Sequence, residues 1–346
     1  MKVIYFVCLC LLICGCCPKC YIPSDDPDPL PNFYVPEQIR VALVLGGGGV
    51  RGMAHVGVIE ELVKANIPID IIVGCSAGSI VGALYADNPD IDHIKKAVWG
   101  LKTDSICDIN IFTCRYGLSQ GGAFHRVINE HLEAECFEEL KIPLIVVATD
   151  LYSGELVVLG SGDLVTAIQA SCALPFVFVP CDYLGRILVD GGVVNPVPAK
   201  IAADLGAKVV IAVDLCELLP KTYPQNLFQI ANRSAEISYM WQNQACTSAA
   251  DFVIRPKTCG VGTFNDKMKR QLYEAGKMAA REVLPSIIEK MRKVESSPSA
   301  TYRQVTLNCY APQINEDERH HEELMFAQNE RNEELLLAEG NDTPLQ

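Results

Sequence analysis

Short apolar runs alternate with longer amphipathic stretches from residue 41 onward. The runs predicted as strands are residues 41–45, 69–73, 144–149, 156–159, 187–189 and 209–215. The stretches predicted as helices are residues 53–66, 79–86, 91–99, 124–133, 164–171, 198–205 and 266–291. Most of the strand runs are continuously apolar rather than alternating, which is typical of strands that are covered on both faces. The pattern therefore predicts an α/β fold around a mainly parallel sheet.

The first residues have the pattern of a targeting segment. Lys2 precedes an apolar run over residues 3–13, which is shorter than a bilayer span requires. Residues 13–16 resemble a bacterial lipoprotein box with cleavage before Cys16, so residues 1–15 are predicted as a signal peptide. Acyl chains on Cys16 would anchor the protein in the cell envelope. The alternatives are a secreted protein, an uncleaved hydrophobic anchor or a wrongly assigned start.

Two further segments flank the predicted domain. Residues 16–39 are rich in proline and aspartate, which favours an extended, semi-rigid tether. The domain itself is expected over residues 40–291. Residues 292–346 are acidic and only weakly patterned, so we expect a peripheral tail, either a solvated helix or disordered.

Composition narrows the possible functions. The chain has 346 residues, is 49% hydrophobic and 21% charged, and is long enough to bury a full core. Its net charge of -13 makes nucleic acid a poor partner. Ten of the 16 cysteines are scattered beyond residue 20 without paired spacing, and no metal-ligand pattern occurs. We therefore expect neither a metal nor a cofactor, and the sequence gives no oligomeric state.

The most informative residue is Ser76. It lies in Gly74-Cys75-Ser76-Ala77-Gly78, between the strand-like run 69–73 and the helix-like run 79–86. A serine at such a strand-to-helix turn, flanked by glycines, is the nucleophile elbow of serine hydrolases. The position predicts acyl transfer through the Ser76 hydroxyl.

A glycine-rich loop precedes that elbow. Gly46 to Gly49 follow the first strand, and Arg51 and Gly52 lead into the next helix. Backbone N–H groups at such a turn form an anion site that can stabilise an oxyanion. Gly47, Gly49 and Gly52 also match a dinucleotide-binding loop. The acid required by that alternative would be Asp70, but it opens the second strand instead of ending it, so the position is wrong.

The general base is expected to be a carboxylate. Asp190 follows the strand-like run 187–189 and precedes Gly191 and Gly192, where a site forms in a parallel sheet. It could take the proton of Ser76 directly, as one half of a dyad. No histidine lies at a strand end with a turn signal. His55 is predicted to be a packing residue. The other histidines either precede the acid candidates or lie in the tail: His93, His125 and His131, then His320 and His321.

These residues resemble the patatin-like phospholipase family, in its bacterial, lysophospholipase-type branch. Three signatures occur in order: Gly47 to Gly52 with Arg51, then Gly74 to Gly78 around Ser76, then Asp190-Gly191-Gly192. The motif-bearing part spans residues 41–214. The resemblance implies a three-layer α/β/α sandwich, a Ser76–Asp190 dyad and an oxyanion hole from the backbone of Gly47, Gly48 and Gly49.

The function that the resemblance implies is hydrolysis of an ester-linked lipid through an acyl-enzyme intermediate. Its partner would be a phospholipid or lysophospholipid, presented at a membrane that the N-terminal anchor also holds. The alternative function class is a nucleotide-binding or non-enzymatic module that uses the glycine loop for anions.

Overall fold

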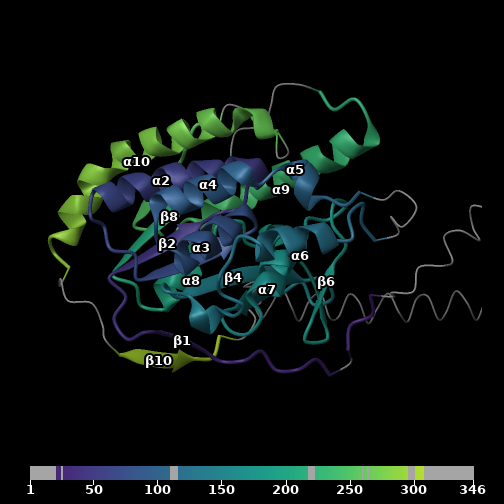
Figure 1. Cartoon of the computed structure of the whole chain (residues 1–346), viewed down its shortest axis with the longest axis horizontal. Helices are drawn as coiled ribbons and strands as arrows, with labels where there is room; N and C mark the ends of the chain where they lie inside the picture. The colour runs from purple at the N-terminus through teal and green to yellow at the C-terminus, as the bar shows by residue number, and fades with distance from the viewer. Residues whose placement is uncertain are drawn as a thin grey trace, which may run out of the picture. The chain divides into compact units, whose positions relative to one another are not determined.

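The computed structural model in Figure 1 describes residues 21–24, 26–109, 116–216, 223–258, 260–262, 265–294 and 301–307. The predicted signal peptide, the predicted lipidation site Cys16 and the tail beyond residue 307 lie outside the described residues. Within them, no helix combines the length and the apolar character needed to cross a membrane.

The main sheet has the strand order β6-β7-β4-β3-β2-β8-β9, and β5 pairs with β4. The strands that run parallel are β2, β3, β4, β8 and β9, over Val41–Leu45, Ile71–Cys75, Leu144–Asp150, Val209–Val213 and Phe252–Ile254. The antiparallel part consists of β5, β6 and β7, over Leu156–Leu159, Cys181–Tyr183 and Arg186–Asp190. The predicted α/β fold with a mainly parallel sheet is confirmed.

Helices cover one face of this sheet and form the larger core (Figure 1). They are α2, α3, α4, α7 and α10, over Met53–Lys64, Ala77–Asp87, Ile91–Gly100, Leu164–Ser171 and Lys269–Met291. Leu43 and Leu45 of β2 point to this face, whereas Ala42 and Val44 between them point to the other. The second core is closed by α8, over Ala199–Asp204. The continuously apolar strands are thus buried on both sides, which gives the three layers.

Strands β3 and β7 meet end to end along β4. Cys75, the last residue of β3, pairs with Val147, and Asp190, the last residue of β7, pairs with Ala148. Both strands lie on the same side of β4, because its other side is paired with β5. They run in opposite directions, so their carboxyl ends face each other. We expected Asp190 at the end of a parallel strand; β7 is antiparallel, and it is this reversal that aims Asp190 at the elbow.

The prediction that residues 16–39 form an extended tether is wrong for residues 33–36. Phe33–Pro36 form strand β1, which pairs antiparallel with β10, Tyr302–Val305, from the segment predicted as a tail. Phe33 and Val35 are buried in the second core. Upstream, Ser24 and Asp28 hydrogen-bond to the backbone of the β6–β7 turn. Alternate apolar side chains on one face drive this packing, although proline-rich composition hides the strand in the sequence.

Further helices frame the site at the carboxyl end of the sheet. Short helices α5 and α6 cover Thr103–Ile106 and Gly122–Asn129, and the longer α9 covers Leu227–Cys246. Single 3₁₀ turns follow the glycine loop, precede β4, follow β7 and precede α10, over Gly49–Gly52, Phe137–Glu139, Gly191–Val193 and Asp266–Met268. Helix α9 was not predicted from the sequence.

Candidate active site

Ser76 sits at the turn between β3 and α3 with a strained backbone. Its φ of 51° lies in the left-handed region that serine rarely adopts, and its ψ is -122°. Three contacts hold it there. The Ser76 N–H donates to Oγ of Ser171 at 2.9 Å, the Ser79 hydroxyl donates to the Ser76 carbonyl at 2.6 Å, and the Ser79 N–H donates to the same carbonyl. The predicted elbow geometry is therefore present, with the Ser76 side chain projecting above the sheet.

Gly78 explains why the elbow needs a glycine two residues after the serine. A Cβ atom on Gly78 would lie 2.0 Å from the carbonyl oxygen of Leu45, at the end of the neighbouring strand β2. The first turn of α3 therefore packs directly on the backbone of β2. This close approach fixes the height of Ser76 above the sheet.

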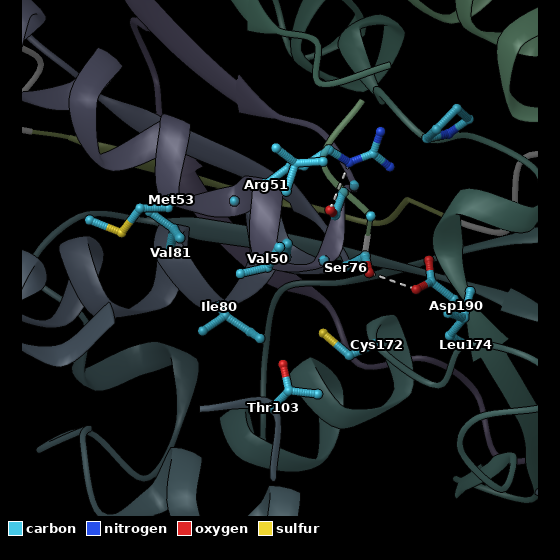
Figure 2. A pocket seen from close by; sticks show the side chains of 18 of the residues that line it. Val50, Arg51, Met53, Ser76, Ile80, Val81, Thr103, Cys172, Leu174 and Asp190 are labelled. Atoms are coloured by element: carbon cyan, nitrogen blue, oxygen red, sulfur yellow. Dashed lines mark hydrogen bonds between the residues drawn. The ribbon is translucent and has the colours of Figure 1, made fainter. Parts of the chain in front are cut away.

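Asp190 faces Ser76 across the junction of β7 and β3 (Figure 2). The Ser76 hydroxyl donates to Oδ2 of Asp190 at 2.6 Å. The other carboxylate oxygen, Oδ1, accepts the N–H of Gly192 at 2.8 Å and lies 4.0 Å from the thiol of Cys75. The Asp190 N–H donates to the carbonyl of Ala173 at 3.0 Å. The carboxylate is thus held on both oxygens, with one of them directed at the serine.

The environment of Asp190 makes it a stronger base than an exposed aspartate. Asp190 is only 1% exposed, and this burial raises its pKa to about 6. The hydrogen bonds from Ser76 and Gly192 act in the opposite direction, because they stabilise the ionised carboxylate. At neutral pH the group is still mostly ionised. A carboxylate with a pKa near 6 therefore has both the charge and the proton affinity that a general base needs.

The glycine loop lies against the serine but offers fewer donors than the sequence suggested. The Gly47 N–H donates to the carbonyl of Pro196 at 3.0 Å, so it is not available to a substrate oxygen. The N–H groups of Gly48 and Gly49 donate to no group among the described residues, and both residues line the same cavity as Ser76. Arg51 donates through Nε to the Gly48 carbonyl at 3.1 Å, as drawn in Figure 2. This fixes the orientation of the loop.

The histidines do not take part in the serine–carboxylate contact. His55 is fully buried, and its Nε2 lies 2.8 Å from the carbonyl of Gly46. Because a carbonyl can only accept, Nε2 carries the proton and donates it. Burial lowers the pKa of His55 to about 4, so the ring is neutral. Among the described residues no histidine lines the cavity, and His55 supports the loop from below, consistent with its prediction as a packing residue.

Asp70 does not fit the dinucleotide alternative. Its carboxylate accepts the N–H groups of Arg40 and Val41 at 2.7 and 3.0 Å, and it forms an ion pair with the Arg40 guanidinium. These residues lie where β2 begins, at the end of the sheet opposite the glycine loop. In the described part of the chain, no three His, Cys, Asp or Glu side chains gather closely enough to hold a metal ion.

A cavity of about 240 Å³ opens beside the serine. Ser76 and Asp190 line one end, and Figure 2 shows Val50, Ile80 and Val81 on the side of Ser76 away from Asp190. Deeper apolar side chains include Phe124 and Phe178, which pack edge to face. A mostly apolar cavity with one reactive polar end suits a ligand with a long apolar chain and one polar linkage.

Two contributors to this site were missed from the sequence. The first is Ser171, at the end of α7, whose hydroxyl oxygen accepts the N–H of Ser76. The second is Tyr239 of α9, which packs so closely on Gly192 that a Cβ atom added to Gly192 would lie 2.5 Å from the tyrosine ring. Burial raises the pKa of Tyr239 well above its usual value, so the phenol stays protonated. Only the apolar spacing before Ser171 was visible in the sequence, and nothing in it indicates a hydrogen bond to Ser76.

Comparison with known proteins places these residues in context. Residues 43–203 match the family described as patatin-like phospholipase. Patatin-like phospholipase domain-containing protein 6 of Homo sapiens is 37% identical over 182 residues, covering 51% of this chain and 13% of that protein. An uncharacterized NTE family protein of Mycobacterium bovis is 36% identical over 178 residues, covering 51% of this chain and 49% of that protein.

Among solved structures, VipD from Legionella pneumophila has a similar fold. The TM-score is 0.53 at 15% identity, and the alignment covers 80% of this chain and 73% of VipD. At this identity the likeness concerns the arrangement of strands and helices alone.

Proposed function

We propose that the chain, whose residues 43–203 match the patatin-like phospholipase family, is a serine acylhydrolase that cleaves carboxylic ester bonds of lipids. The observation that carries the proposal is the 2.6 Å hydrogen bond from the Ser76 hydroxyl to Asp190, at the polar end of an apolar cavity. The matched relatives support a lipid hydrolase.

The first half of the reaction forms an acyl-enzyme. Ser76 Oγ attacks the ester carbonyl carbon while its proton passes to Oδ2 of Asp190. The carbonyl oxygen takes up the negative charge, and the N–H groups of Gly48 and Gly49 donate to it. When the tetrahedral intermediate collapses, the bond to the alcohol oxygen breaks. Asp190 returns its proton to that oxygen, and the alcohol leaves.

The second half releases the fatty acid. Water takes the place of the alcohol, Asp190 accepts one of its protons, and the hydroxide oxygen attacks the acyl carbon. Collapse breaks the bond to Ser76 Oγ, which regains a proton from Asp190. Both halves use the same carboxylate, so no histidine is required.

The cavity favours a substrate with a long acyl chain. Its apolar walls would remove such a chain from water, which stabilises the complex by roughly 0.8 kcal/mol per buried methylene group. We propose a phospholipid or a lysophospholipid as the substrate, as expected for the lysophospholipase-type branch. The N-terminal lipid anchor at Cys16 and a location in the cell envelope stay predictions from the sequence alone.

A fluorophosphonate probe tests the nucleophile, because it reacts with activated serine hydroxyls. We expect the wild-type chain to be labelled and Ser76→Ala to remain unlabelled with an unchanged circular dichroism spectrum. Hydrolysis of a panel of phospholipids and lysophospholipids, followed by mass spectrometry of the products, then identifies the bond that is cleaved. Equal labelling of wild type and Ser76→Ala would reject the proposal. Substantial turnover by Asp190→Asn would reject the dyad.

A further inference from the structure

Helix α9 forms one wall of the cavity. Ala235, Glu236, Tyr239 and Asn243 line it, and their spacing places them on one side of the helix. Tyr239 covers Gly192, and the Gln242 amide donates to the carbonyl of Val193 at 3.2 Å. The helix is therefore attached directly to the turn that follows Asp190.

The opposite side of α9 carries large apolar side chains into solvent. Ile230, Ile237 and Trp241 are 51%, 38% and 75% exposed. They are separated by seven and four positions, so they share one side of the helix. At about 100° per residue, this side lies roughly opposite the one that lines the cavity. We call these three residues the outer side of α9.

The charge of α9 differs from that of the rest of the chain. The chain has a net charge of -13, but α9 has one basic and one acidic residue in its 20 residues. These two, Arg233 and Glu236, form an ion pair with each other. The outer side therefore presents an uncharged apolar surface with a tryptophan, the residue type that favours the boundary between water and lipid.

We propose that the outer side of α9 docks on an electrically neutral lipid surface, such as a zwitterionic phospholipid bilayer. The proposal rests on the proposed function, because the substrate of the cavity would come from that surface. An amphipathic helix lying in the interface buries its apolar side among the headgroups. Docking in this way separates the cavity from the lipid by the width of one helix, about 10–12 Å. The Gln242–Val193 hydrogen bond then holds the turn after Asp190 against the inner side of α9, one helix width from the surface.

The two tryptophans of the chain allow a direct test. They are Trp99 and Trp241, so Trp99→Phe leaves Trp241 as the single reporter in the full chain. Ser76→Ala is added so that no lipid is consumed. With phosphatidylcholine vesicles we expect the Trp241 emission to shift to shorter wavelength and to be quenched by acyl chains that carry bromine.

Matched variants locate the contact. Ile230→Ser with Ile237→Ser in the same reporter chain is expected to lower partitioning into the vesicles about tenfold or more, because two buried apolar side chains are lost. Met278→Ser is the control, since Met278 is 61% exposed on α10 and lies outside the proposed surface. Its partitioning should match that of the reporter chain.

Several results would overturn the proposal. Trp241 emission that stays unchanged while the protein floats with the vesicles would mean that another segment holds the lipid. A wavelength shift without vesicles that grows with protein concentration would assign the outer side of α9 to a second copy of the chain. The fluorescence readout needs no hydrolysis, so docking and activity are tested separately. If the wild-type chain is inactive but Trp241 of the reporter chain enters lipid, the proposed function is rejected and docking is supported. An active wild type whose reporter stays in water rejects docking alone.

Discussion

The Oγ atom of Ser171 accepts a hydrogen bond from the N–H of Ser76 at 2.9 Å, across a separation of 95 residues. Two positions later, the carbonyl of Ala173 accepts the N–H of Asp190 at 3.0 Å. One short segment at the end of α7 therefore holds the backbones of both proposed catalytic residues. It fixes their separation independently of the strands that carry them.

Ser171→Ala should impair turnover more than folding. It leaves the Ser76 N–H without its partner in a strained turn, which costs about 1–3 kcal/mol and lets Ser76 shift. We expect kcat to fall about tenfold while KM changes little, measured on one ester substrate. Ser161→Ala is the matched control, because Ser161 is also buried and its hydroxyl donates to the carbonyl of Pro31. If both variants lose kcat equally at equal stability, Ser171 has no positioning role.

Activity should decline on the acidic side of neutrality. The base must be ionised to accept the Ser76 proton, and burial raises the pKa of Asp190 to about 6. We expect kcat/KM to fall tenfold per pH unit below about 6 and to be level between pH 7 and 8. A pH profile of ester hydrolysis measures this directly. A profile that stays flat down to pH 5 would contradict the assignment of Asp190 as the base.

Asp190→Asn should stabilise the fold at neutral pH while abolishing activity. Because burial raises the folded-state pKa of Asp190 from 3.8 to about 6, the folded protein binds more protons than the unfolded chain between these values. Stability from this group is thus present below pH 4 and is lost as the pH rises through 6. The loss is about 3 kcal/mol. Urea unfolding should show Asp190→Asn as the more stable protein at pH 8, with the difference shrinking toward pH 4. A less stable variant at pH 8 would show that burial of this carboxylate costs little.

The strand β1 should contribute to stability as part of the domain. Phe33 is 3% exposed and packs against Gly160, whereas its neighbour Tyr34 is 60% exposed. Phe33→Ala should lower the free energy of unfolding by about 3–5 kcal/mol. Tyr34→Ala, one position away on the same strand, should change it by less than about 1 kcal/mol. Similar unfolding curves for the two variants would mean that residues 33–36 are a spacer after all.

Much of the parallel half of the fold was visible in the sequence. Strands such as β2 are continuously apolar because they are buried on both faces, and a glycine-flanked serine after β3 is a strong local signal. The partner Asp190 could be nominated from its place at a strand end. That information is local, so one sequence suffices to find it.

The features that the sequence did not reveal depend on long-range pairing. The direction of β7 is set by its register on β4, and no residue near Asp190 encodes it. The Gly47 N–H is taken by Pro196, nearly 150 residues away. Helix α9 escaped detection because its apolar residues lie on two opposite sides, which blurs the periodicity that marks an ordinary surface helix.

The junction of β3 and β7 on β4 also sets the order in which the chemistry can arise. A chain folded only as far as residue 150 would contain the nucleophile turn and the strand that supports it, yet no base. Asp190 arrives only when the chain has reversed through β5, α7 and β6 and β7 has paired in the correct register. A slip of one residue would turn the carboxylate to the opposite face of the sheet. The contact between Ser76 and Asp190 therefore requires the whole segment up to β7 to be folded in the correct register, and a misregistered chain would lack it.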